Sequence, residues 1–207
     1  SDLGTCDNWD WNTCPTTEGA AVLRFGGGGH HWCWNNLGSG EGVRFNQIYW
    51  WFGGGGEYNL NGNAFRLGEW GGSEGRIRND SSTAQKIECN LKLETAVGVD
   101  PVNGDLWLSG AINNNGQELR VRGANDKMLT LSGTISGTGK LLVQNANGYA
   151  KVKLNGSSTF TGDVGIDTGE FWVDAGGALG AGTIYVGVNW LASSAAKLWL
   201  ADSDGGL

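Results

Sequence analysis

Short apolar motifs recur in the middle of the chain with a nearly fixed period, and this period constrains the fold more than any other feature. One series consists of LWLSG, LTLSG and VKLNG, which start at equal steps, at positions 106, 129 and 152. A second consists of LRV, LLV and VGI, which start at positions 119, 141 and 164. A third position repeats with the same period, from Ile112 to Ile135. Three short segments therefore recur in every period.

Each motif alternates apolar, variable and apolar positions, with Gly, Asn, Ser or Asp at its ends. This alternation is typical of a strand with one buried face, and the polar and glycine positions are typical of sharp turns. No helical period lies between the motifs, which excludes an alternating α/β fold. The repeat therefore predicts an all-β coil of stacked parallel strands. It continues in FWV, IYV and LWL, which start at Phe171, Ile184 and Leu198.

The same pattern extends upstream. RFGGGG and WFGGGG repeat one motif around Phe25 and Phe52, and YNLNG, FRLG and RIRN follow as short alternating segments. The 38 glycines have no Gly-X-Y period, so we interpret them as turn positions rather than collagen. We predict one solenoid domain over residues 1–207, with residues 1–20 as an N-terminal cap.

The four cysteines divide into two groups. Cys6 and Cys14 flank a loop rich in Asp and Asn, which predicts a disulfide that pins the cap of an exported protein. Cys89 shares its alternation with Ile87 and Leu91, which predicts a buried thiol. The state of Cys33 is left open.

Charge and composition disfavour several classes of partner. The chain has 14 basic and 21 acidic residues, a net charge of -7, which opposes binding to nucleic acid or anionic membranes. No apolar run approaches the roughly 20 residues of a membrane span. His30 and His31 are adjacent and point to opposite faces of an extended strand, a poor geometry for a shared metal. No metal or other cofactor is expected.

Two resemblances follow from these motifs. The segment from LTLSGTISG at Leu129 to DAGGALG at Gly180 resembles the autotransporter-associated β-strand repeat, a right-handed parallel β-helix unit of bacterial passenger domains and other secreted proteins. The repeat also places large aromatic residues at outward positions, such as Trp107 in LWL and Trp172 in FWV. In this the chain resembles carbohydrate-binding module family 89, β-helical modules associated with xylanases of gut bacteria. The first resemblance implies a right-handed parallel β-helix and a secreted or cell-surface bacterial protein. The second implies xylan as the ligand.

Strict alternation predicts which aromatic side chains point outward. Ile48, Trp50 and Phe52 belong to the core, which leaves Tyr49 and Trp51 outside. The nearly equal spacings of Trp34, Trp51 and Trp70 suggest one such residue per turn of the coil. The predicted carbohydrate-binding residues are Trp34, Tyr49, Trp51, Trp70, Trp107, Trp172, Tyr185 and Trp199.

A ladder of indoles on stacked strands suits an extended glycan, because an indole buries the C–H faces of a sugar ring at little entropic cost. The alternative is that single tryptophans pack on neighbouring strands or cover corners. Which of the two aromatic groups, N-terminal or C-terminal, forms the site is left open.

The sequence thus predicts a monomeric, non-catalytic module that binds xylan or a related β-1,4-linked plant polysaccharide and targets a catalytic module in the same polypeptide. An adhesin or spacer β-helix is the alternative. A hydrolase or lyase is disfavoured, because Asp163 and Asp167 fit equally well as strand-end residues and glycoside hydrolysis needs two carboxylates at a defined separation.

Overall fold

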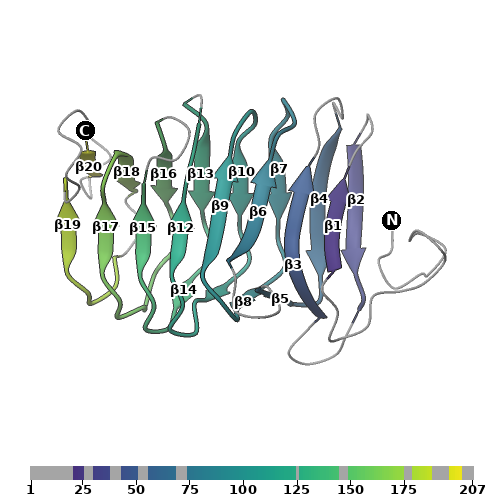
Figure 1. Cartoon of the computed structure of the whole chain (residues 1–207), viewed down its shortest axis with the longest axis horizontal. Coiled ribbons are helices and arrows are strands. Elements are labelled where there is room, and N and C mark those ends of the chain that lie inside the picture. The colour runs from purple at the N-terminus through teal and green to yellow at the C-terminus, as the bar shows by residue number, and fades with distance from the viewer. Residues whose placement is uncertain are drawn as a thin grey trace.

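The chain folds into a parallel β-helix in the computed structural model, which describes residues 21–25, 30–37, 43–50, 56–68, 74–124, 126–144, 149–174, 179–187 and 196–201. Within these ranges there are twenty strands and no helix, and every strand pair is parallel. The strands stand side by side along the long axis of the molecule (Figure 1). The all-β solenoid predicted from the repeat is confirmed. The proposed cap and its cysteines lie outside the described residues.

The strands form three faces of the coil. Face A contains β2 (His30–Asn35), β4 (Glu57–Gly62), β7 (Gln85–Ile87), β10 (Leu106–Leu108), β13 (Met128–Leu131), β16 (Lys151–Leu154), β18 (Gly169–Val173) and β20 (Ala196–Leu200). Face B contains β1 (Ala21–Phe25), β3 (Val43–Trp50), β6 (Gly75–Asn79), β9 (Val97–Pro101), β12 (Leu119–Val121), β15 (Leu141–Val143), β17 (Val164–Ile166) and β19 (Ile184–Val186). Face C contains β5 (Phe65–Leu67), β8 (Leu91–Leu93), β11 (Ile112–Asn113) and β14 (Ile135–Ser136).

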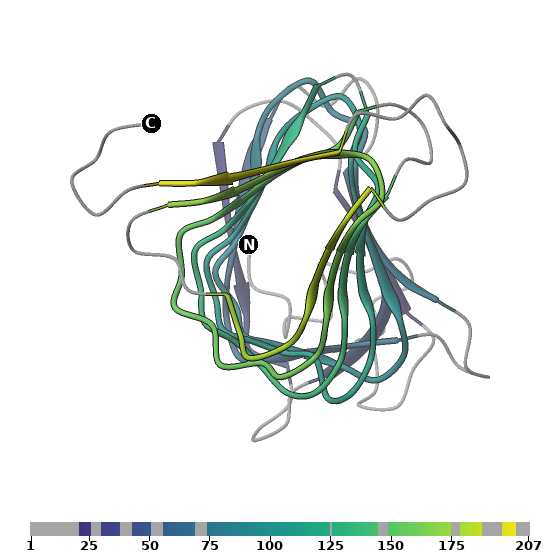
Figure 2. The same cartoon turned by 90° about the vertical axis from the view of Figure 1, so that its left-hand side faces the viewer.

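The long strand β3 joins two faces. Its first residues, Val43 to Phe45, pair with β5 of face C, whereas Gln47 to Trp50 pair with β6 of face B. From β4 to β15 separate short strands occupy these positions, so the chain passes from face A to face C to face B in each of these turns. Among the described residues after β14, strands alternate between faces A and B alone. Viewed along the coil, successive turns overlie one another around a common interior (Figure 2).

The strand register confirms the sequence repeat in the middle of the chain. Leu106 pairs with Leu129, which pairs with Val152, the equal steps seen in the sequence. Elsewhere the corners change length, so the step from β2 to β4 is longer and the step from β16 to β18 is shorter. The two glycine-rich motifs do not align, because Phe25 pairs with Trp50 and not with Phe52.

Inward side chains stack into apolar columns. Leu106, Leu129, Val152 and Phe171 follow one another across face A without solvent exposure. As predicted, Trp50 lies in the core, where its ring stacks on Phe25 at 5.4 Å between centroids.

Cys89 and Cys33 are both buried free thiols. The burial of Cys89 was predicted, whereas that of Cys33 answers a question that the sequence left open. Burial raises the pKa of the Cys89 thiol to about 12 and also raises the pKa of Cys33. Both therefore serve as core residues rather than as reactive groups.

Buried amides close the corners, where the backbone leaves the strand ladder. The side chain of Asn114 donates to the Gly139 carbonyl at 2.9 Å and accepts from the Gly139 amide at 2.9 Å. The nearby Gly137 has a φ of 106°, a conformation that favours glycine. Such corners satisfy the backbone groups that the turn exposes.

Candidate functional site

An outward column of side chains runs along face A. Each strand contributes its central outward residue, and the register places these residues next to one another. The column reads Trp32, Asn59, Lys86, Trp107, Thr130, Lys153, Trp172 and Trp199. Four indoles thus belong to one column, and polar or cationic residues separate the first three of them.

The indoles of this column are accessible. Trp32 is 69% exposed, Trp107 48% and Trp199 38%. Trp172 is half-buried because its ring stacks on that of Trp199, with centroids 5.2 Å apart and an interplanar angle of 24°. In the last two rungs each indole therefore covers part of one face of the other, and the outer faces and edges of the pair remain accessible.

The first three indoles of the column recur at regular intervals. Three strand steps separate Trp32 from Trp107, and three more separate Trp107 from Trp172. At about 4.8 Å per step, each interval is about 14 Å. A ligand that touches more than one of these three indoles must therefore be extended along the coil axis.

A cleft of about 230 Å³ lies between the first two indoles. Trp32 and Trp107 line its two ends, and Asn59 and Lys86 line it between them. Tyr58 stacks on His31 at 4.8 Å in the wall, where burial raises the pKa of the tyrosine hydroxyl. The cleft thus combines apolar ends with a polar middle.

Glu170 orients the aromatic pair at the other end of the column. Its carboxylate accepts from the Trp172 indole N–H at 3.3 Å, from Lys197 at 3.1 Å and from the Tyr149 hydroxyl at 3.4 Å. The hydrogen bond to Glu170 raises the pKa of Lys197, so this lysine stays charged. These contacts fix the plane of Trp172 before any ligand arrives.

The lysines of face A are matched by carboxylates. Four ion pairs lie on or beside this face: Lys86 with Glu88, Lys151 with Asp126 (3.4 Å), Lys153 with Asp174 (2.9 Å) and Lys197 with Glu170 (3.1 Å). The surface around the indoles is therefore electrically balanced, which suits an uncharged ligand.

Sequence reasoning placed most of these indoles on the correct side. Trp107, Trp172 and Trp199 share the column, and Trp34 faces outward on the same strand as Trp32, 56% exposed. Tyr185 is exposed but lies on face B, apart from the other members of its predicted group. Trp51 and Trp70 lie outside the described residues.

The predicted spacing of the N-terminal tryptophans is wrong. Trp34 pairs with Asn61 in the next turn, well beyond position 51, so the distance from Trp34 to Trp51 is too short to be one turn of the coil. Trp32 is not among the predicted residues. The signal was present in HHWCWN: once Cys33 is buried, Trp32 and Trp34 on either side of it must both face outward.

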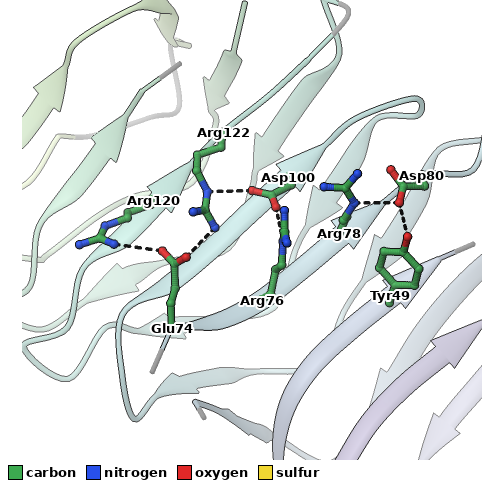
Figure 3. A network of polar contacts seen from close by, with 8 residues as sticks. All are labelled: Tyr49, Glu74, Arg76, Arg78, Asp80, Asp100, Arg120 and Arg122. Carbon is green, nitrogen blue, oxygen red and sulfur yellow. Dashed lines mark hydrogen bonds and ion pairs between the residues drawn. The ribbon is translucent and has the colours of Figure 1, made fainter. Parts of the chain in front are cut away.

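Tyr49, another predicted site residue, forms a hydrogen bond within the protein on face B. It is half-buried, and its hydroxyl donates to Asp80, which also forms an ion pair with Arg78 at 2.7 Å (Figure 3). Burial first, and then the hydrogen bond to Asp80, raises the pKa of Tyr49. Its ring is therefore less available to a ligand than the indoles of face A.

A second part of the same polar surface spans β6, β9 and β12. The buried carboxylate of Asp100 accepts from Arg76 and, at 3.1 Å, from Arg122. Glu74 pairs with Arg122 at 2.7 Å and with Arg120 at 3.2 Å (Figure 3). These side chains cover face B in the middle of the coil.

Other kinds of site find no support in the part of the chain that the structure describes. No group of three or more His, Cys, Asp and Glu side chains there could hold a metal ion. The same residues include no helix long and apolar enough to cross a membrane. Comparison with protein families, curated proteins and solved structures found no match.

Proposed function

We propose that the protein is a non-catalytic carbohydrate-binding module that holds an extended, uncharged polysaccharide along face A. One observation carries the proposal: Trp32, Trp107, Trp172 and Trp199 occupy a single outward column. An indole removes the C–H face of a sugar from water while its N–H stays available to a hydroxyl. Exposed indoles in register provide successive platforms for one chain.

The ligand that we favour is xylan or a related β-1,4-linked plant polysaccharide. The interval of about 14 Å between indoles fits an extended chain rather than a compact oligosaccharide. The balanced charge of face A favours neutral glycans over pectin. The choice of xylan within this class, a secreted bacterial origin and an attached glycoside hydrolase follow from the family resemblance, and we propose them on that ground.

Binding is a better account of the cleft than catalysis. Glycoside hydrolysis uses two carboxyl groups across the scissile bond. Among the described residues that line the cleft, Glu57 is the one carboxylate. A binding module would instead act by raising the local concentration of its partner enzyme on an insoluble substrate.

The test is affinity electrophoresis and calorimetry with soluble xylan, mixed-linkage glucan and pectin. Trp107→Ala should weaken xylan binding by about tenfold or more, as expected for an aromatic residue at the centre of an interface. Thr134→Ala, an exposed position outside face A, is the matched control. If no glycan retards the protein, or if Trp107→Ala binds like the control, the spacer or adhesin alternative is favoured.

A further inference from the structure

A second recess, of about 330 Å³, opens on face B, on a different side of the coil from the indole column. It lies over β17, between the side chains of Leu142 in β15 and Tyr185 in β19. The register puts Leu142, Gly165 and Tyr185 in one outward column. Gly165 therefore forms a gap between an aliphatic and an aromatic neighbour.

Gly98 belongs to the same outward column, because it pairs with Arg120, which pairs with Leu142. Gly98 and Gly165 differ in what occupies the position of the missing Cβ. At Gly98, the guanidinium of Arg122 occupies the place where a Cβ would stand, so this glycine makes room for a side chain of the protein itself. At Gly165, one atom alone lies within 4 Å of such a Cβ, the Leu142 Cδ1 at 2.8 Å. Apart from this methyl group, the space above Gly165 is open.

The walls of the recess suit a sugar ring. Tyr185 is 46% exposed and supplies an aromatic surface, and Leu142 supplies an apolar one. Asp163 and Asp167 stand at the two ends of β17, where their carboxylates can accept hydrogen bonds from hydroxyl groups. One oxygen of Asp163 already accepts from the Thr183 amide at 3.1 Å, which orients the carboxylate. Hydrogen bonds to an ionised acceptor are stronger than neutral ones.

We propose that this recess is a second carbohydrate site, which takes one or two rings of an uncharged glycan, such as a chain end or a branch. Glu118, which is already paired with Arg120, and Lys140 also line it, so the two Asp carboxylates outnumber the one ammonium, and this acidic balance disfavours uronic acids. Its length of two strand steps, about 10 Å, is too short for a long chain. The site goes beyond the proposed function, because face B presents it independently of face A.

Asp163 and Asp167 do not suggest a hydrolytic pair. The extended strand β17 separates Asp163 from Asp167, which places their Cα atoms about 13 Å apart. Glycoside hydrolases hold their carboxyl groups about 5 to 9.5 Å apart. The recess is better described as an apolar surface with hydrogen-bond acceptors around its rim.

Two sites on different faces would make one module bivalent. A long chain lies along face A, while face B holds a branch of that chain or the end of another. Simultaneous engagement raises the avidity for a branched or bundled polysaccharide above that of either site alone.

The experiment is calorimetry with xylobiose, cellobiose and arabinose, supported by NMR mapping of perturbed amides. It compares the wild type, Trp107→Ala, Gly165→Thr and the double variant. A threonine at Gly165 occupies the middle of the recess and requires only the Leu142 Cδ1 methyl to move. A β-branched residue also suits a strand. Tyr185→Ala removes the aromatic wall if Gly165→Thr does not fold, which circular dichroism reports.

We expect Trp107→Ala to retain binding of at least one of the three sugars, with perturbed amides around Gly165. We expect Gly165→Thr or Tyr185→Ala, added to the Trp107→Ala variant, to abolish this remaining binding. Loss of all binding in Trp107→Ala overturns the face B site and leaves the proposed function intact. Binding that survives Trp107→Ala at full strength on every glycan but disappears in Gly165→Thr overturns the face A proposal instead. Binding of none of the sugars, or their hydrolysis, overturns the face B site.

Discussion

At the scale of single residues, two aromatic side chains that are neighbours in sequence have opposite roles. Trp50 is buried and stacks on Phe25, whereas Tyr49 uses its hydroxyl to reach Asp80 across the surface of face B. The alternation of a strand explains both, because successive side chains point to opposite faces. What alternation could not reveal is that an outward residue already has a partner.

Tyr49 should make stability depend on alkaline pH. Its pKa is raised above the ordinary value of about 10. The stabilising contribution is therefore fully present below the unfolded-state pKa, about 10, and is lost as pH rises through the folded-state pKa.

Urea midpoints of the wild type and Tyr49→Phe, measured from mildly to strongly alkaline pH, provide the test. We expect the wild type to be the more stable protein at the lower end of this range, and the difference to shrink as Tyr49 ionises. Tyr58, whose pKa is also raised, is present in both proteins, so its effect cancels in the comparison. A difference that stays constant over the whole range would contradict the assignment.

At the scale of strands, side-chain ladders tie successive turns together. Asp100 in β9 joins Arg76 of β6 to Arg122, which follows β12 directly, so that one carboxylate links three neighbouring strands. The carboxylate is nearly inaccessible, with 1% of its side chain exposed. Removing it takes away the acceptor of Arg76 and leaves Arg122 paired with Glu74 alone.

Asp100→Ala should lower the free energy of unfolding by about 3 kcal/mol, as expected when one partner of a buried ion pair is removed. Asp174→Ala is the matched control, because its pair with Lys153 is exposed and should contribute less than about 1 kcal/mol. Chemical denaturation of the two variants measures the difference. Equal effects would mean that the network of Figure 3 adds no more than an ordinary surface pair.

The sequence predicted the strands better than their alignment. In the middle of the chain each inward position recurs at a constant interval. The sequence alone therefore predicted that Leu106, Leu129 and Val152 stack on one another. In the N-terminal turns the corners vary in length, so spacing alone could not show that Trp32 shares a column with Trp107. The register of β4 and β7 is what places these two residues in one column.

At the scale of the whole molecule, a solenoid has a core that is continuous along its axis but closed only at its ends. Each turn contacts its neighbours alone, so the terminal turns are covered on one side unless a cap is added. In the last described turn, the inward residues Ile184 and Val186 remain 37% and 48% exposed. At the other end, the sequence predicts a cap in residues 1–20, closed by a disulfide between Cys6 and Cys14.

Counting accessible thiols tests that cap against the rest of the coil. Cys33 and Cys89 are buried free thiols with raised pKa values, so the native protein should not react at either one near neutral pH. In denaturant without reductant, two thiols should react if the predicted disulfide is present, and all four should react after reduction. Four reactive thiols before reduction would contradict the disulfide. Rapid labelling of Cys89 under native conditions would contradict the continuous core, because Cys89 lies in the middle of the coil and can be reached only by opening the turns around it.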